Sequence, residues 1–200
     1  MKRLVFLCVL IITPISNATN FNDGKTHNID YSLAEVKVES QTTVNILDGA
    51  SIADFVHVFH NSQVNVLGGY IGGDVTAWGS SVVNLSDGYV VDQLNGYNNS
   101  RIYLTGGQIA TNCPPPYDIN LSDQAVLTIE GSNFLVNGIP VGAGIIRSSG
   151  TLSGILANGD TIDVEFYTND GAHIVLIPEP ATLLLLGLGG LILRKKLYKL

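Results

Sequence analysis

Residues 44–52 read VNILDGASI, and three later stretches repeat the pattern: VNVLGGYI at 64–71, VNLSDGYV at 83–90 and IYLTGGQI at 102–109. The copies begin at Val44, Val64, Val83 and Ile102, so their spacing is nearly constant. Each opens with an apolar, a polar and an apolar residue, the period-2 pattern of a strand with one buried face. We therefore expect one short strand at the start of every copy.

A glycine follows each of these strands at a fixed position, which indicates a corner where the backbone needs a positive φ or a tight bend. One extra residue in the first copy aligns two further apolar columns after the corner, so the register is internally consistent. The glycines are Gly49, Gly69, Gly88 and Gly107, and the two columns are Ile52, Ile71, Val90, Ile109 and Val56, Val75, Leu94.

One copy is too short to bury its own apolar residues, whereas stacked copies form continuous columns of Val, Ile and Leu. The sequence therefore predicts an all-β fold built around a short parallel β-helix, or solenoid, with one coil per copy. A repeat longer than three hexapeptides favours a right-handed coil over the left-handed hexapeptide type. The alternative is an antiparallel sandwich, which is disfavoured because sandwiches seldom keep glycine in one repeated column.

The chain divides into five expected segments: a signal peptide at 1–18, an N-terminal cap at 19–43, solenoid repeats at 44–131, an antiparallel β cap at 132–177 and a sorting tail at 178–200. Val36 to Val38 is expected to form a partial first coil. Asn158-Gly159-Asp160 is a typical hairpin turn, here between strands at 152–156 and 162–166.

Composition supports an ordered, acidic body. Apolar residues make up 46% of the chain and charged residues 14%, with a net charge of −7. Most basic residues lie in the terminal segments, so the body keeps four bases against sixteen acids, a net charge near −12. Such a surface repels phosphate backbones, which argues against nucleic acid as a partner.

The N-terminus has the pattern of an export signal. Lys2 and Arg3 precede an apolar run from Leu4 to Ile12, and small residues end the segment at Ala18. We expect a short signal helix cleaved by signal peptidase after Ala18. The alternative is an uncleaved anchor.

The C-terminus has three parts: Pro178-Glu179-Pro180, the uncharged run Ala181 to Leu193, and the basic cluster Arg194-Lys195-Lys196. As a helix, thirteen residues cover about 20 Å, short of the ~30 Å hydrocarbon core. The run could still insert with the basic cluster on the cytoplasmic side. The two prolines indicate an extended, accessible segment outside the membrane.

This three-part tail resembles the PEP-CTERM sorting signal of Gram-negative bacteria. The resemblance implies recognition by an exosortase, transient anchoring in the inner membrane, and delivery to the cell surface, the outer membrane or the extracellular matrix. The alternative is an ordinary tail anchor. The body, with its VNVLGG-type coils and the later VLTIEGSNF segment, also resembles the β-helical proteins that often carry this tail. That second resemblance supports the fold and implies no activity.

Catalytic candidates are few. Asp48 and Asp87 share a corner column, but two coils would separate them by ~10 Å, beyond the range of an inverting glycosidase pair. Asp74 and Asp92 fall in neighbouring columns, although aspartate is also an ordinary turn former. Cys113 sits alone before three prolines. We therefore expect no catalytic residues and no enzyme activity.

Metal and cofactor sites are not expected either. His57 and His60 are three residues apart, but no third ligand accompanies them. The stretch LGGYIGGD at 67–74 departs from the calcium-binding nonapeptide, because Ile71 replaces a glycine and Asp74 falls one place late.

The column formed by Asn45, Asn65 and Asn84 is predicted to point outward and to form an amide ladder along the sheet. The same face could also dock sugars, because Tyr70, Trp78, Tyr89, Tyr97 and Tyr103 lie in the same coils. Two hypotheses follow. The chain is a non-enzymatic exported surface or matrix protein, or it is a carbohydrate-binding or polysaccharide-processing module at the same location, with exopolysaccharide as a possible partner.

Overall fold

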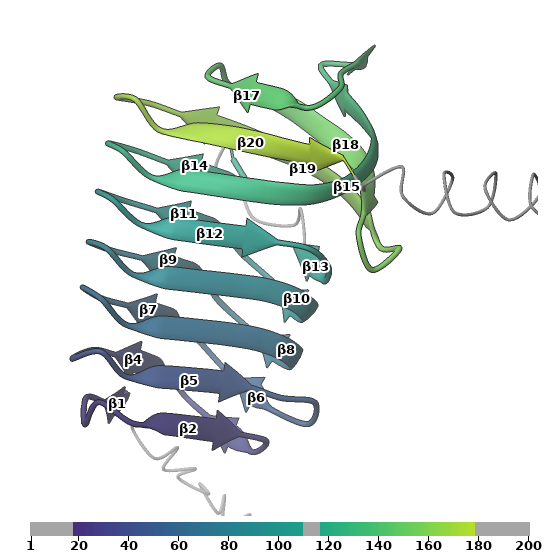
Figure 1. Cartoon of the computed structure of the whole chain (residues 1–200). Helices are drawn as coiled ribbons and strands as arrows, with labels where there is room; N and C mark the ends of the chain where they lie inside the picture. The colour runs from purple at the N-terminus through teal and green to yellow at the C-terminus, as the bar shows by residue number, and fades with distance from the viewer. Residues whose placement is uncertain (1–17, 110–116, 179–200) are drawn as a thin grey trace, which may run out of the picture.

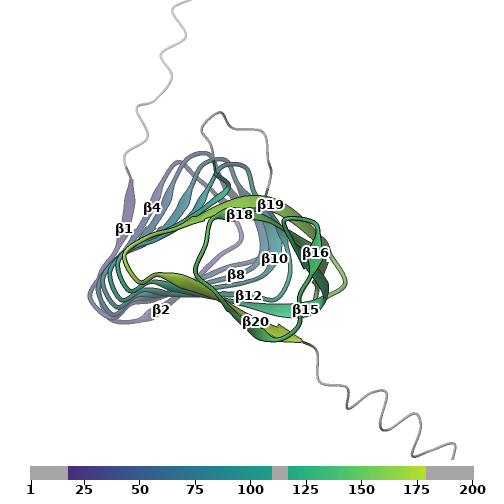
Figure 2. The same ribbon diagram turned by 90° about the horizontal axis from the view of Figure 1, so that it is seen from above.

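The computed structural model describes residues 18–109 and 117–178, and every regular element in these ranges is a β-strand. The signal segment, the expected hydrophobic tail helix and Cys113 lie outside the described residues. Short strands wind upward in a stack whose outline, seen along the axis, is roughly triangular (Figures 1 and 2). Neighbouring strands on each side pair in parallel, so this part of the chain is a β-solenoid and not an antiparallel sandwich.

The long face of the solenoid carries the repeated VN phrase. Val44, Val64, Val83 and Ile102 are direct partners in successive strands, as the spacing predicted. The strands of this face, from the N-terminal end upward, are β2 (Thr26–Ile29), β5 (Thr43–Ile46), β8 (Gln63–Ile71), β10 (Val82–Val90), β12 (Arg101–Leu104), β15 (Val126–Val136) and β20 (His173–Pro178).

Two shorter faces complete each coil. The second face consists of β3 (Ser32–Leu33), β6 (Ser51–Ile52), the ends of β8 and β10, and β13 (Gln108–Ile109). The third consists of β1 (Thr19–Phe21), β4 (Val36–Val38), β7 (Val56–Val58), β9 (Val75–Ala77), β11 (Leu94–Gly96), β14 (Ile119–Leu121) and the end of β19 (Thr161–Thr168). The predicted alignments of Ile52 with Ile71 and of Val56 with Val75 are confirmed.

The repeated residue columns of the sequence account for both the corners and the core of the solenoid. Gly49, Gly69, Gly88 and Gly107 all have positive φ, between 80° and 98°, which confirms the prediction that the recurrent glycine turns the chain. The inward residues of the three faces form one core, and most of them are completely buried. Burial of stacked aliphatic side chains is therefore the main stabilising contribution in the body.

The cap consists of an antiparallel hairpin of β18 (Gly150–Leu156) and β19, together with the short strands β16 (Ile139–Pro140) and β17 (Gly144–Ile146). The turn at Asn158-Gly159-Asp160 is confirmed, with Gly159 at φ 97°. Its tip contacts the coil below, because the Gly107 amide donates to Asp160 Oδ2 at 2.8 Å and the Asn158 amide donates to the Thr105 carbonyl at 3.0 Å.

The two ends of the solenoid are more regular than expected. Residues 19–43 contain a full coil, which corrects the expectation of a partial one, since β1, β2 and β3 each pair in parallel with the coil above. At the other end, β20 pairs antiparallel with β17 of the expected cap, but it also pairs in parallel with β15, and the end of β19 pairs in parallel with β14. The hairpin is therefore inserted within a final coil.

Candidate functional site

The start of the sorting motif lies in the last strand of the solenoid. Pro178 ends β20, is exposed and pairs with Gly131 on β15. The other motif residues lie outside the described residues: Glu179, Pro180, Ala181, Leu193, Arg194, Lys195 and Lys196. Within residues 18–109 and 117–178, no helix is long and apolar enough to cross a membrane. The last described strand reaches the first residue of the predicted Pro-Glu-Pro segment.

The position predicted for signal-peptidase cleavage adjoins the first strand. Ala18 is half-buried and immediately precedes β1. The amide nitrogen of Thr19 lies 2.8 Å from the carbonyl oxygen of Glu35, and Thr19 pairs with Val36. A chain beginning at Thr19 would keep every residue of β1.

The predicted asparagine ladder is present and is one residue longer than expected. Asn84 Nδ2 donates to Asn65 Oδ1, Asn65 Nδ2 donates to Asn45 Oδ1, and Asn45 Nδ2 donates to Asn28 Oδ1, at 2.7–2.8 Å. Gln63 Nε2 also donates to Asn65 Oδ1 at 2.7 Å. Because these amides bond to one another along the stack, the ladder ties successive coils together.

Replacing Asn65 with aspartate should break this ladder at its centre. An ionised carboxylate has no donor for Asn45 Oδ1, and two oxygens would face each other, so we expect the free energy of unfolding at pH 7 to fall by about 2 kcal/mol. The loss should shrink at acidic pH, where a protonated carboxyl can donate. The matched control is Asn61→Asp in an exposed turn, expected to change stability by less than about 0.5 kcal/mol. Equal effects in urea unfolding would contradict the structural role of the ladder.

The aromatic side chains do not gather on the asparagine face. Tyr103 alone continues that column, above Asn84. Tyr70 and Tyr89 stack on the second face, with ring centroids 5.9 Å apart and planes 5° apart. Trp78 and Tyr97 stack beyond the third face, with centroids 4.1 Å apart. The expected sugar platform is therefore divided among three parts of the surface.

The rings of both pairs lie one above the other between coils, so each ring covers one face of its neighbour. The contacts resemble those of the asparagine ladder, since each joins equivalent positions of successive coils. Both aromatic pairs therefore link successive coils.

The two aspartates predicted to share a corner column differ in local structure: Asp48 lies in a turn, and Asp87 lies in β10 at an irregularity of its pairing with β8. Asp48 lies against Gly68, where a Cβ would meet its side chain, and Asp87 Oδ1 accepts from the Gly88 amide at 2.7 Å. Asp74 Oδ1 accepts from the Gln93 amide at 2.9 Å. Burial raises the pKa of Asp74, and the nearby charge of Asp92 raises it further.

A pocket of about 340 Å³ lies beneath the β18–β19 hairpin, between Tyr89, Leu104 and Val164. Its lining within the described residues includes one carboxylate, that of Asp163. Most glycoside hydrolases use two carboxylates, one on either side of the bond.

His57 and His60 do not converge on a common point. His57 is half-buried, stacks on Phe55 at 5.6 Å, and burial lowers its pKa. His60 is exposed in a turn with φ 58°. Across the described ranges 18–109 and 117–178, no group of three potential metal ligands is present.

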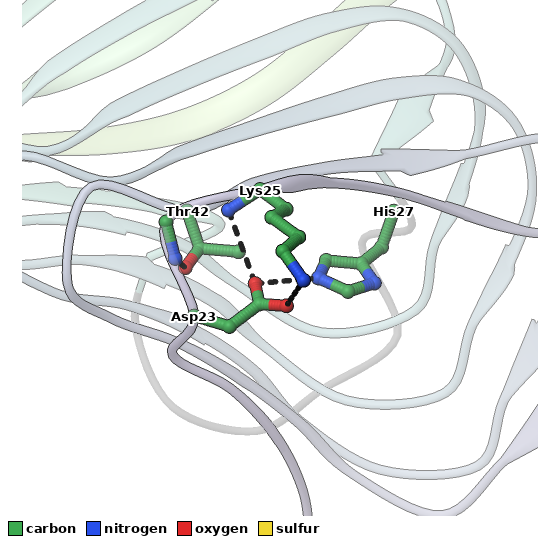
Figure 3. A network of polar contacts seen from close by, with 5 residues as sticks. Asp23, Lys25, His27 and Thr42 are labelled. Carbon is green, nitrogen blue, oxygen red and sulfur yellow. Dashed lines mark hydrogen bonds and ion pairs between the residues drawn. The ribbon is translucent and has the colours of Figure 1, made fainter.

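A polar cluster lies at the N-terminal end, in the segment expected to form a cap, although its residues were not singled out from the sequence (Figure 3). His27 pairs with Val44 in the inward-facing column, packs against Phe21 with ring centroids 4.9 Å apart and planes tilted by 50°, and lies 2.8 Å from Asp23 Oδ1. The hydrogen bond from His27, followed by that from the Lys25 amide, lowers the pKa of Asp23. Polar groups facing the open end of a stack oppose edge-to-edge pairing, so this cluster is a cap. The signal in the sequence is His27-Asn28-Ile29, which repeats Val44-Asn45-Ile46 with His in the inward position.

Comparison with known proteins identifies the tail. The family model of the PEP-CTERM protein-sorting motif matches residues 176–196, which include the last residues of β20. The motif marks a C-terminal sorting signal of an exported protein. A search of the curated proteins and a search of the solved structures each found no match to this chain.

Proposed function

We propose that this chain, which carries a PEP-CTERM sorting motif, is a non-enzymatic protein of the cell surface or extracellular matrix of a Gram-negative bacterium. The observation that supports this most is the motif match at residues 176–196, fused without a linker to an acidic β-solenoid. In the solenoid, the asparagine side chains of the long face form hydrogen bonds to one another along the stack.

The proposed route begins with export and cleavage by signal peptidase after Ala18. Ala181 to Leu193 then anchors the precursor in the inner membrane, with Arg194-Lys195-Lys196 on the cytoplasmic side. An exosortase recognises Pro178-Glu179-Pro180 and releases the body to the outer membrane, the cell surface or the matrix. The exposed position of Pro178 supports access by a processing enzyme.

We further propose that the solenoid is right-handed. In Figure 1 the strands of the long face run from left to right at the front while the coils rise, and Figure 2 is consistent with a return along the opposite side. The repeat, which is longer than three hexapeptides, favours the same hand.

Mass spectrometry of the mature protein from its native cell tests the sorting proposal. We expect a body that begins at Thr19 and lacks Ala181–Leu200. Replacing Pro178, Glu179 and Pro180 with alanine should leave the uncleaved chain in the inner membrane and reduce the surface form at least tenfold. The matched control is Pro140→Ala, an exposed proline of β16, which should be sorted normally. A surface form that retains Ala181–Leu200 would contradict the proposal.

A further inference from the structure

Exposed aliphatic side chains concentrate at the C-terminal end of the solenoid. Within the described residues, four large aliphatic side chains are exposed, and three are at this end: Ile139 at 66%, Ile145 at 53% and Ile177 at 44%. The fourth, Leu67, lies on the side of the stack, in β8. We call Ile139, Ile145 and Ile177 the apolar end. Exposed apolar groups of this kind typically mark a contact surface.

Strand pairing places two members of the apolar end on the same side of the sheet. Ile145 on β17 is the direct antiparallel partner of Val175 on β20, so both side chains point to one face. Ile177 follows Val175 by two positions and points the same way. Ile139 belongs to β16, which lies at the same end of the stack in Figure 2.

The charged residues of the cap are unevenly distributed. None of the sixteen acids of the body falls between residues 131 and 159, and the one base in that stretch is Arg147. The exposed acids of the cap, Asp163 and Glu165, lie on β19, whereas Glu130 is the half-buried partner of Ile177 and Asp170 lines a hollow with Arg147. The stretch that carries Ile139 and Ile145 therefore contributes one positive charge and no carboxylate.

The chain length fixes how far this end can be from a membrane anchor. Pro178 is the last residue of β20, and the apolar run of the tail starts at Ala181. Three residues span at most about 10 Å when fully extended. The C-terminal end of the body of an anchored precursor must therefore lie beside the bilayer.

We propose that the apolar end contacts the phospholipid surface while the precursor is anchored, before it is released. This rests on the proposed function, since it requires the tail to be a membrane anchor. Apolar side chains bury favourably at the boundary between headgroups and acyl chains, and Arg147 can pair with lipid phosphates. The contact would hold Pro178 at the membrane surface.

The test uses the anchored chain produced in a host without an exosortase, with Cys113→Ser, reconstituted into vesicles of phosphatidylcholine and phosphatidylglycerol. A fluorophore is attached at Ala143→Cys beside the apolar end, or at Ser32→Cys in the first coil; both positions are exposed. Spin-labelled lipid should quench the Ala143 probe at least twofold more than the Ser32 probe. Adding Ile139→Asn and Ile145→Asn should remove most of that difference, whereas the control Leu67→Asn should preserve it.

Equal, weak quenching of the two probes in chains that float with the vesicles would overturn the lipid contact while leaving the anchor intact. If the probe at position 143 is shielded from solvent only at a high protein-to-lipid ratio, the apolar end contacts a second copy of the chain, and the proposed lipid contact is overturned. A chain that does not float with the vesicles would contradict the proposed anchor, and the inference with it.

Discussion

Replacing Leu85 with alanine should lower the free energy of unfolding of the body, residues 19–178, by about 2–5 kcal/mol. Leu85 is 1% exposed in β10, directly between Val66 in the coil below and Leu104 in the coil above. Truncation removes contacts with both neighbours and leaves a cavity that the stacked backbone cannot close. Urea unfolding followed by circular dichroism measures the difference.

The matched control is Leu67→Ala in β8. Leu67 is the same residue type at 45% exposure, and we expect its truncation to change stability by less than about 0.5 kcal/mol. Similar losses at the two positions would mean that the inward and outward assignments of these strands are wrong.

Replacing Gly131 with alanine should destabilise the body by about 3 kcal/mol, because it forces a side chain into a closed junction. Gly131 is the residue of β15 at which the strand passes from the solenoid into the cap. It pairs in parallel with Pro178 and antiparallel with Leu156. A Cβ there would meet the Ile155 carbonyl oxygen at 2.0 Å and the Leu156 Cα at 2.9 Å, both backbone atoms that cannot rotate away.

Gly144→Ala provides the control for the glycine prediction, because a Cβ at Gly144 would meet no atom within 4 Å. Thermal unfolding should leave this variant within about 0.5 kcal/mol of the parent. A Gly131→Ala variant as stable as Gly144→Ala would show that β15 does not bend against β18 as described.

The central coils were predictable because each residue column repeats at nearly constant spacing. The positions of Gly69 and Gly88, and the alignment of Val64 with Val83, follow directly from it. Only part of the first coil, Val36 to Val38, was predicted, because Asn28 and Asn45 are closer in sequence than the later members of their column, and because His27 replaces the expected aliphatic residue. The inward position of the first coil holds the polar residue His27 because, among the described residues, no coil lies beneath the first one.

The last coil was missed for a different physical reason. Phe166 is stacked on Ile119, yet the two are far apart in sequence because the cap hairpin is inserted between the two coils. A fixed period cannot detect a column interrupted in this way. The local alternation of Ile174, Val175 and Leu176 predicted a strand but not its parallel partner in β15.

Whether a candidate site was predicted correctly depended on which face of the coil each residue column occupies. Asn45 and Asn65 were placed correctly because the two residues are in one column. Tyr70 and Trp78 were grouped with them because they are near in sequence. The three-sided coil places these residues on different surfaces. The recurrent glycines in the sequence indicate where the chain turns, but they do not give the angle of each turn.

Distances between spin labels along one outward column test the stacked-coil architecture most directly. With Cys113→Ser, one label is placed at Thr26 and the second at Arg101, Val126 or His173, which lie four, five and six coils above it in the same column. At ~4.8 Å per coil, we expect backbone separations of about 19, 24 and 29 Å, rising in that order. Distances that do not increase from Arg101 to Val126 to His173 would contradict the solenoid.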